Sequence, residues 1–284
     1  MITHTVDVSI CIITYNQDKY IERAIESVLM QQCNFTYDII ISDDSSTDNT
    51  KTIVERYAMK SPGLIKAYYA ESNLGMLRNW EKALKLCTGR YIALLEGDDF
   101  WNDSYKLQKQ FGILESHPDC VISFTNATNA YESGEEGYPR YVDKTEEFYT
   151  TKDLLEYNFI PTCSVLMRNH ITETFFPGAY FKSPFADWII HIVNSRFGKI
   201  HFLNEFTCTY QIHSLGVWGG IKKEKQLLNK LKALNCVSEI LKEKEFQSTI
   251  RASRKKLLQE ICLYYKEQRK MFQYFKYKLI IIFL

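Results

Sequence analysis

The sequence predicts an α/β protein built on a mostly parallel, doubly wound sheet, with a helical extension at its C-terminal end. Two observations predict the sheet: short apolar runs alternate with segments of helical periodicity over about the first 90 residues, and polar residues end each apolar run. Strict strand–helix alternation is typical of parallel sheets with right-handed crossovers. A third observation predicts the extension, since the pattern from residue 221 is helical and rich in lysine.

The alternating elements follow from short Ile- or Leu-rich runs for the strands and from apolar stripes at helical spacing for the helices. In order, we expect strand 8–14, helix 18–31, strand 38–42, helix 48–59, strand 66–70, helix 75–87 and strand 91–96. Asp48 is suited to cap the second helix. Gly89 follows the third helix, where a glycine commonly ends the last turn.

Beyond residue 100 the alternation loosens. We expect a helix at 104–116, a strand at 120–124, a mobile polar loop at 126–150, a short helix at 151–157, a strand at 164–167, a helix at 187–197 and two strands ending at 211. The predicted organisation is one α/β domain over residues 1–220 and a basic helical extension over residues 221–284.

Charge is distributed unevenly along the 284 residues. The net charge is only +1, which gives no reason to expect a nucleic-acid partner, but residues 1–220 carry 19 Lys/Arg against 28 Asp/Glu and residues 221–284 carry 16 against 6. An acidic body with a basic end suggests a cation-requiring site in the first part and an anionic partner for the second.

Cysteine usage and the N-terminal sequence indicate the compartment. The eight cysteines are scattered without a CxxC pair, which fits buried thiols in a reducing cytosol better than disulfides or a zinc site. The first ten residues lack the basic and apolar regions of a signal peptide, and no run of 18 apolar residues occurs. We therefore expect a cytoplasmic protein.

Two pairs of adjacent aspartates end two of the predicted strands: Asp43-Asp44 and Asp98-Asp99. In an open α/β sheet, ligands bind at the carboxyl ends of the strands. Four acids at one edge repel each other unless a cation or a ligand donor lies between them. Helix capping alone would explain Asp48 but not the pair before it.

The segment LEGDDFW is the stronger signal. It places Glu96, Asp98 and Asp99 within four residues, and crowded carboxylates suit Mg²⁺ or Mn²⁺, although Gly-Asp-Asp is also turn chemistry. The sequence contains no GxGxxG and no GxxxxGK[ST] motif. The phosphates of a bound nucleotide would therefore be held by a metal and by side chains. Arg78 is a candidate for this, or else it lies on a solvated helix face.

Several stretches together resemble family 2 glycosyltransferases, which have the GT-A fold. They are VSICIITYNQDKYIERAIESVLMQ, IIISDDSSTDNT, SNLGMLRNWEKALKLCTGRYIALLEGDDFW, FADW and YQIHSLGVW, and they cover most of residues 6–218 in the family's order. The resemblance implies inverting, metal-dependent transfer of a sugar from a nucleotide-diphosphate sugar, usually a UDP-sugar, to an acceptor hydroxyl, in surface polysaccharide or glycan synthesis.

The resemblance also implies roles for single residues. Thr14, Tyr15 and Asn16 match the family's first nucleotide-contacting loop, and Asp43 matches the acid that reads the uracil. Asp98 and Asp99 match the DxD-type signature, with Asp99 as the metal ligand and Asp98 near the ribose or the metal. Glu96 stands where many members have Asp.

Two later residues complete the implied site. Asp187 in FADW matches the catalytic base of the family's "ED" motif, whose first acid is here Ala186. His213 matches a histidine near the metal and pyrophosphate, as a third protein ligand or a phosphate donor. The chemistry agrees, because a sugar hydroxyl needs a carboxylate to accept its proton and a dication stabilises a leaving diphosphate. The alternatives are a helix-capping Asp187 and a core histidine at 213.

The basic end of the chain allows two interpretations. It ends MFQYFKYKLIIIFL, and basic residues interleaved with aromatics can lie on an anionic membrane surface. The alternative is a helical subdomain with a solvated basic face. Membrane contact would suit a lipid-linked glycan acceptor and would place the protein at the inner face of the cell membrane.

Two other functions remain open from the residues alone. A sugar-phosphate nucleotidyltransferase shares an α/β nucleotide-binding layout, but it would normally show a glycine-rich phosphate loop near the first strand, which VSICIITYNQ lacks. A non-catalytic nucleotide-sugar or metal-binding module would keep Asp43 and Asp99 and need no base at Asp187.

Overall fold

The computed structural model describes residues 6–132, 139–140, 145–172, 174–214, 216 and 221–282. The chain divides into two compact units. The first comprises Met1–Thr150, Phe159–Phe175 and Val193–His213, and the second comprises Thr151–Asn158, Phe176–Ile192 and Ser214–Leu284. Two stretches that precede residue 220 therefore group with the C-terminal helices rather than with the sheet.

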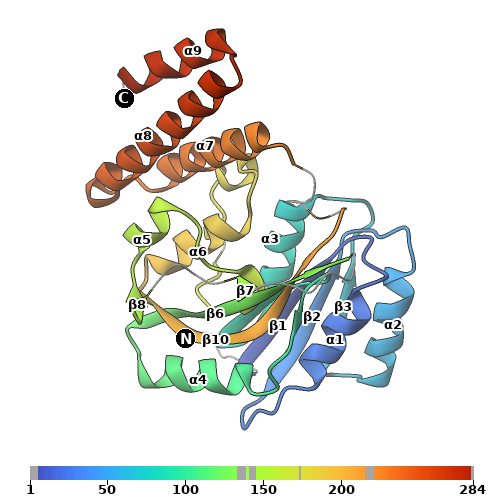
Figure 1. Ribbon diagram of the computed structural model, residues 1–284. Helices are drawn as coiled ribbons and strands as arrows, with labels where there is room; N and C mark the ends of the chain where they lie inside the picture. Colours follow the sequence, from blue (N-terminus) through green and yellow to red (C-terminus); the bar gives the residue numbers. More distant parts are fainter. Residues whose placement is uncertain are drawn as a thin grey trace. The chain divides into compact units, whose positions relative to one another are not determined.

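The first unit is built on one mixed sheet with the strand order β3-β2-β1-β4-β9-β6-β10-β5, to which β7 and β8 add at β6 and β10 (Figure 1). The strands are β1 (Val8–Thr14), β2 (Tyr37–Asp43), β3 (Ile65–Tyr69), β4 (Tyr91–Glu96), β5 (Phe100–Trp101), β6 (Cys120–Tyr131), β7 (Pro139–Arg140), β8 (Phe148–Tyr149), β9 (Leu166–Arg168) and β10 (Lys199–Ile212). The pairs among β3, β2, β1 and β4 are parallel, so β1, β2 and β4 end at the same edge.

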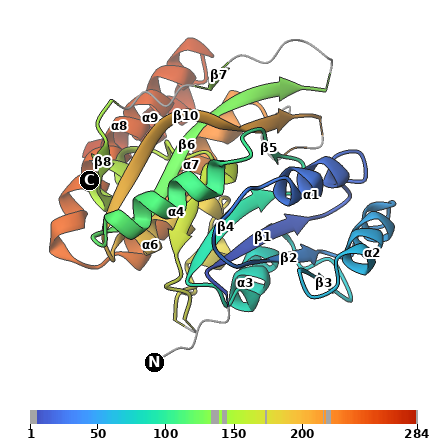
Figure 2. The same cartoon turned by 90° about the horizontal axis from the view of Figure 1, so that it is seen from below.

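Helices cover both faces of this sheet. They are α1 (Ile21–Leu29), α2 (Thr50–Lys60), α3 (Met76–Leu86) and α4 (Lys106–Ser116), with a 3₁₀ turn η1 (Thr162–Ser164). Figures 1 and 2 show α1 and α3 on opposite faces. Because side chains alternate along a strand, Ile10 and Ile12 enter the core under α1, whereas Ser42 of β2 hydrogen-bonds Asn79 of α3.

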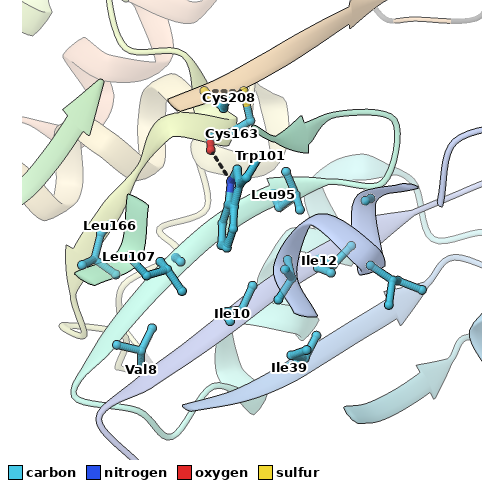
Figure 3. Close-up of a cluster of buried hydrophobic side chains, with 14 of the residues drawn as sticks. Val8, Ile10, Ile12, Ile39, Leu95, Trp101, Leu107, Cys163, Leu166 and Cys208 are labelled. Atoms are coloured by element: carbon cyan, nitrogen blue, oxygen red, sulfur yellow. Dashed lines mark hydrogen bonds between the residues drawn. The ribbon is translucent and has the colours of Figure 1, made fainter. Parts of the chain in front are cut away.

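The core under α1 and α4 includes Trp101 of β5 (Figure 3). Its indole Nε1 donates a 2.8 Å hydrogen bond to the Cys163 carbonyl, so the one polar atom of this buried ring is satisfied. The Sγ atoms of Cys163 and Cys208 lie 3.5 Å apart beside it. All eight cysteines are free and all but Cys33 are buried, which confirms the prediction of buried thiols.

The second unit is helical. It contains α5 (Thr151–Glu156), the 3₁₀ turn η2 (Tyr180–Lys182), the start of α6 (Asp187–Ser195), α7 (Lys223–Ile240), α8 (Lys244–Glu267) and α9 (Met271–Ile282). Helices α7 and α8 bury apolar side chains such as Leu234, Val237, Leu258 and Ile261. Among the helices described, none combines the length and apolar composition needed to cross a bilayer.

The predicted α/β sheet and C-terminal helices are confirmed, with differences in detail. The predicted loop at 126–150 is wrong for residues 126–131, because β6 continues to Tyr131 by pairing with β10. It is also wrong for β7 and β8, two short strands that pair with β6 and β10. Its residues 133–138 and 141–144 lie outside the described residues. The two strands predicted before residue 211 are one continuous strand, β10. Its pairing with β6 shifts register around Phe206, as at a β-bulge, but the strand does not end there. The two-residue strand β5 was not predicted.

The predicted role of Gly89 is also wrong. The residue that ends α3 is Cys87, whose backbone is extended, and Gly89 is not among the glycines with positive φ. A Cβ at Gly89 would lie 2.4 Å from the Ser9 backbone nitrogen. Glycine is needed there because β1 passes too close for any side chain.

Candidate functional site

The corner that follows β4 carries the second aspartate pair. Gly97 sits between Glu96 and Asp98, and its N–H donates to the Ile13 carbonyl of β1 at 2.9 Å. A Cβ at Gly97 would lie 2.6 Å from Gln17 Oε1 and 2.9 Å from Thr14 Oγ1. Glycine thus lets the corner pack directly on the end of β1, which brings the acids to the carboxyl edge of the sheet.

Asp99 is a buried carboxylate that the described residues satisfy only in part. Its side chain is 1% exposed. The Gln211 N–H of β10 donates to Oδ1 at 2.8 Å, while buried Oδ2 has no hydrogen-bond partner among the residues described. Burial raises the pKa of Asp99 well above its usual value, and the nearby Asp98 and Glu96 raise it further. A positive partner at Oδ2 would remove this penalty.

Asp98 is paired with His213. Their Oδ2 and Nε2 atoms lie 2.8 Å apart, and the imidazole ring packs against Tyr20 at 4.8 Å between ring centroids. The hydrogen bond to Asp98 raises the pKa of His213, against the opposing effect of burial. His213 therefore lies at the acid corner, with its Nε2 engaged by Asp98. Its role toward a metal or a phosphate stays a prediction.

The donor set of this corner fits a hard divalent cation. Carboxylate oxygens of Asp98 and Asp99 are the ligands that Mg²⁺ and Mn²⁺ prefer, and imidazole is compatible with Mn²⁺. Within the described ranges, no group of three or more His, Cys, Asp or Glu side chains already surrounds a common point. A partial protein shell of this kind is usual for Mg²⁺ bound together with substrate phosphates.

The loop after β1 is tied to the loop after β2. Thr14 Oγ1 donates to Gln17 Oε1 at 2.8 Å. Asn16, with φ at 51°, donates its N–H to Ser46 Oγ and accepts from the Thr47 N–H, each at 2.8 Å. Tyr15 between them is 43% exposed. These bonds hold the loop in a fixed shape and leave an aromatic ring facing solvent.

The first aspartate pair divides into two roles. Asp43 Oδ1 accepts from Ser46 N–H and Oγ at 2.9 and 2.6 Å, and burial raises the pKa of Asp43. Asp44 instead accepts from the Leu74 and Gly75 N–H groups at 2.8 Å, one on each oxygen. Asp44 therefore needs no cation, because backbone donors at the start of α3 already satisfy it.

Two other predicted residues have local partners. Arg78 is 55% exposed at its side chain and lies 3.2 Å from Glu81 on the same helix. Asp48 accepts from the Thr50 N–H at 2.9 Å and from the Asp18 N–H at 3.0 Å. Asp48 thus satisfies donors at the start of α2 and before α1, but the N-cap residue of α2 is Asn49 and not the predicted Asp48. A phosphate contact by Arg78 stays a prediction.

Asp187 belongs to the second unit, where it begins α6. Asn158 Nδ2 donates to its Oδ2 at 2.8 Å, and Trp188 Nε1 donates to the Leu154 carbonyl at 2.8 Å, which fixes the first turn. One turn later, burial lowers the pKa of His191 to about 4. The imidazole is therefore neutral at pH 7 and adds no positive charge beside the Asp187 carboxylate.

A pocket of about 270 Å³ opens beside the acid corner in the first unit. It is lined by Lys19, Tyr20, Arg23, Asp98, Phe100, Tyr131, Glu132 and Gln211. The Arg23 guanidinium lies 3.3 Å above the Phe100 ring, and Lys19 lies 3.2 Å from Glu132. Acidic and basic side chains line the walls. The pocket therefore gives a polar ligand access to Asp98 and to Gln211 of β10, whose N–H donates to Asp99.

Sequence reasoning missed the residues that position the site. Gln211 contributes a backbone N–H, which no side-chain pattern can reveal. Tyr20 falls within the helix predicted over residues 18–31, and nothing in its local pattern indicates its contact with His213. Gly97 offered a signal, since a glycine between a strand end and an acid pair often means close backbone approach.

Known proteins match this chain over most of its length. A model of the family described as glycosyl transferase family 2 matches residues 9–175. An uncharacterized protein of Mycobacterium tuberculosis, Rv1520, is 33% identical over 210 residues, which cover 74% of this chain and 60% of that protein. A putative teichuronic acid biosynthesis glycosyltransferase of Bacillus subtilis, TuaG, is 29% identical over 244 residues, covering 83% of this chain and 94% of that protein. The chain thus spans less than two thirds of the length of the mycobacterial relative.

Solved structures share the fold. Residues 1–349 of Staphylococcus aureus TarS in complex with UDP align with a TM-score of 0.61 at 18% identity, covering 89% of this chain and 70% of that one. The mannosyltransferase PcManGT of Pyrobaculum calidifontis, in complex with GDP-Man and Mn²⁺, aligns with a TM-score of 0.61 at 12% identity, covering 99% and 84%. At such low identity these matches show the architecture and not the substrate.

Proposed function

The chain belongs to glycosyltransferase family 2 and has the GT-A fold, and on this basis we propose that it is an inverting enzyme that transfers a sugar from a UDP-sugar to an acceptor hydroxyl. TarS and PcManGT bind UDP and GDP-Man with the same architecture, which supports a nucleotide-diphosphate sugar as donor. The alternative donor is a sugar on another nucleoside diphosphate.

The observation that carries this proposal is the state of Asp99. Its carboxylate is buried at the carboxyl edge of the sheet, one oxygen has no partner within the described part of the chain, and its pKa is raised by burial and by neighbouring acids. Such a group is costly in a folded protein unless it binds something positive. A site for a dication, and through it for a diphosphate, accounts for that cost.

We assign Asp99, Asp98 and His213 to Mn²⁺ or Mg²⁺. A bound dication would supply Lewis-acid stabilisation of the charge that develops on the leaving diphosphate. The chain's own part is to hold the acids in place: Gln211 N–H fixes Asp99 Oδ1, and His213 holds Asp98 while Tyr20 packs on the imidazole.

We assign the nucleoside to the loops after β1 and β2. Ser46 holds Asp43 through Oδ1, and none of the described residues donates to Oδ2, so this oxygen can accept the imide N–H of a uracil. Thr14, Tyr15 and Asn16 form the adjacent wall, where the exposed Tyr15 ring suits stacking on a base. We propose that Arg78 contacts the phosphates when the donor binds, and that its ion pair with Glu81 is then broken.

We assign the catalytic base to Asp187. The acceptor hydroxyl must lose its proton as the new glycosidic bond forms, and a carboxylate within hydrogen-bond reach can accept it. Asn158 orients the carboxylate through Oδ2. Attack from the face opposite the leaving group inverts the anomeric centre.

For the acceptor, we propose a glycan or lipid-linked glycan in surface polysaccharide synthesis. Support comes from the name of TuaG, to which the chain is similar over nearly that protein's whole length. A nucleoside diphosphate is too strongly charged to cross a bilayer, so we place the reaction on the cytoplasmic side, where such donors are made.

The test is a panel of nucleotide sugars scored for Mn²⁺-stimulated release of the nucleoside diphosphate. With the active donor, Asp187→Asn should lower turnover about 10²- to 10⁴-fold while calorimetry still detects donor binding. Asp99→Asn should abolish cation-dependent binding of UDP. The exposed carboxylate Asp119, paired with Lys199, provides the control, and Asp119→Asn should leave both readouts unchanged. Turnover that survives Asp187→Asn, or binding that is indifferent to EDTA, would contradict the assignments.

A further inference from the structure

The outer face of α9 carries a stripe of exposed apolar side chains. Phe272, Phe275, Leu279 and Ile282 are 80%, 54%, 56% and 67% exposed. Their spacing of three, four and three residues places them on one side of the helix. No residue of α9 is buried. Exposed apolar residues scattered singly are ordinary, but a continuous stripe on one helix indicates an interaction surface.

The opposite face of α9 is the one that packs on the protein. Tyr277 stacks on Tyr265 of α8 with 5.6 Å between ring centroids, and Cys262 Sγ lies 3.9 Å from the Tyr274 carbonyl. Gln273, Tyr274, Tyr277 and Ile281, which are half-buried, share that side. Figure 1 shows α8 and α9 as a helical hairpin. The apolar stripe therefore faces away from the helix that anchors α9.

The turn before α9 holds this orientation. Arg269 has a φ of 56°, and the Lys270 N–H donates to the Tyr265 carbonyl at 2.9 Å, which is the bonding of a Schellman end. Lys270 Nζ also lies 2.6 Å from Glu224 of α7, whose carboxylate accepts from the Tyr265 hydroxyl. The hairpin is thus tied to α7 and is not a frayed end.

The charged residues of α9 and of the turn before it are all basic. At 100° per residue, Lys276 and Lys278 fall on the two edges of the apolar face, and both are exposed. After Glu267 the sequence contains Arg269, Lys270, Lys276 and Lys278 and no Asp or Glu. Lysines that flank an apolar face can place their ammonium groups among anionic headgroups while their alkyl stems stay in the apolar layer.

We propose that the outer face of α9 binds the surface of an anionic lipid bilayer, with Phe272, Phe275, Leu279 and Ile282 inserted at the headgroup boundary and Lys276 and Lys278 contacting lipid phosphates. The 12 residues of α9 extend about 18 Å, short of the about 30 Å of a hydrocarbon core, so the helix lies along the interface. A second copy of the chain fits less well, because two such faces would bring four lysines together.

The proposal is tested by flotation of the full chain with vesicles of phosphatidylcholine alone or mixed with phosphatidylglycerol, without donor or metal. We expect binding to the mixed vesicles that weakens with salt. Phe275→Ser with Leu279→Ser should lower partitioning at least about tenfold, and Lys276→Glu with Lys278→Glu about 30-fold or more. Neither double variant should change the melting temperature, since none of the four replaced side chains is buried.

Matched controls alter the same chemistry elsewhere. Met59→Ser with Leu263→Ser removes two apolar side chains that are 76% and 57% exposed, and Lys60→Glu with Lys152→Glu reverses two exposed lysines outside α9; both should bind like the unmodified chain. No preference for anionic vesicles, or equal binding by the α9 variants, would overturn the proposal. A dimer seen in sedimentation that dissociates in the Phe275→Ser variant would also overturn the proposal, because the face would then bind a second copy of the chain. Because no donor is present, the result is independent of glycosyl transfer.

Discussion

At the residue scale, neighbouring acids of this chain differ in what satisfies them. Asp44 has a backbone N–H on each oxygen, while Asp99 has one buried oxygen without a partner among the residues described. The sequence predicts both pairs at the same edge of the sheet, and both pairs lie at strand ends there. It could not separate their roles, because the donors to Asp44 come from residues 74 and 75, about 30 positions along the chain.

Gly97 provides the residue-scale prediction. In Gly97→Ala, the new Cβ must displace Gln17 or Thr14, so the corner that carries Asp98 and Asp99 shifts away from β1. We expect turnover to fall about 100-fold, as for a displacement of about 1 Å in an active site, and metal-dependent UDP binding to weaken.

The control for this change is Gly112→Ala in α4, where a Cβ meets nothing within 4 Å. Alanine favours the helix by about 1 kcal/mol, so stability should be equal or higher and activity unchanged. If Gly97→Ala retained full turnover and binding, the close packing of the corner would not be required for the site.

At the element scale, α4 connects the strand β6 and the 3₁₀ turn η1, which are far apart in the sequence. Gln110 donates its Nε2 hydrogens to the carbonyls of Ser123 in β6 and Ser164 in η1, at 2.8 and 2.9 Å. Its Oε1 accepts from Lys106 Nζ at 2.7 Å. Lys106 is fully buried, and burial lowers its pKa to about 8. One side chain thus satisfies three buried polar groups.

Replacing Gln110 with leucine should therefore be strongly destabilising. Gln110→Leu leaves two buried carbonyls and a buried ammonium without this partner, at about 1–3 kcal/mol for each group, so we expect a loss of about 3 kcal/mol or more in the free energy of unfolding, measured by chemical denaturation.

Gln108 on the same helix is the matched control, because the one donor to its Oε1 among the described residues is the exposed Asn34 N–H. Gln108→Leu should cost less than about 1 kcal/mol. Equal losses for the two variants would show that the bridging role assigned to Gln110 is wrong.

At the scale of the whole molecule, the chain contains two compact units, each with buried apolar side chains of its own. We expect calorimetric unfolding to depart from two-state behaviour, with a calorimetric enthalpy larger than the van't Hoff enthalpy. Because Asp43 and Asp99 lie in the first unit, UDP with Mn²⁺ should shift the transition of that unit more. A single transition with equal enthalpies would contradict this.

The sequence by itself determined the alternating sheet, the positions of β1 and β4, the acids at their edge and the family, since these follow from local periodicity and contiguous motifs. Only the tertiary structure decided that Gly97 and Gly89 serve close packing, and that Asp44 is satisfied on both oxygens while one Asp99 oxygen has no partner within the described part of the chain. It also decided that β6 and β10 are long paired strands and that α9 turns its apolar stripe outward. The physical reason is that each of these depends on which backbone or side chain, distant in sequence, comes into contact, and local patterns carry no record of that partner.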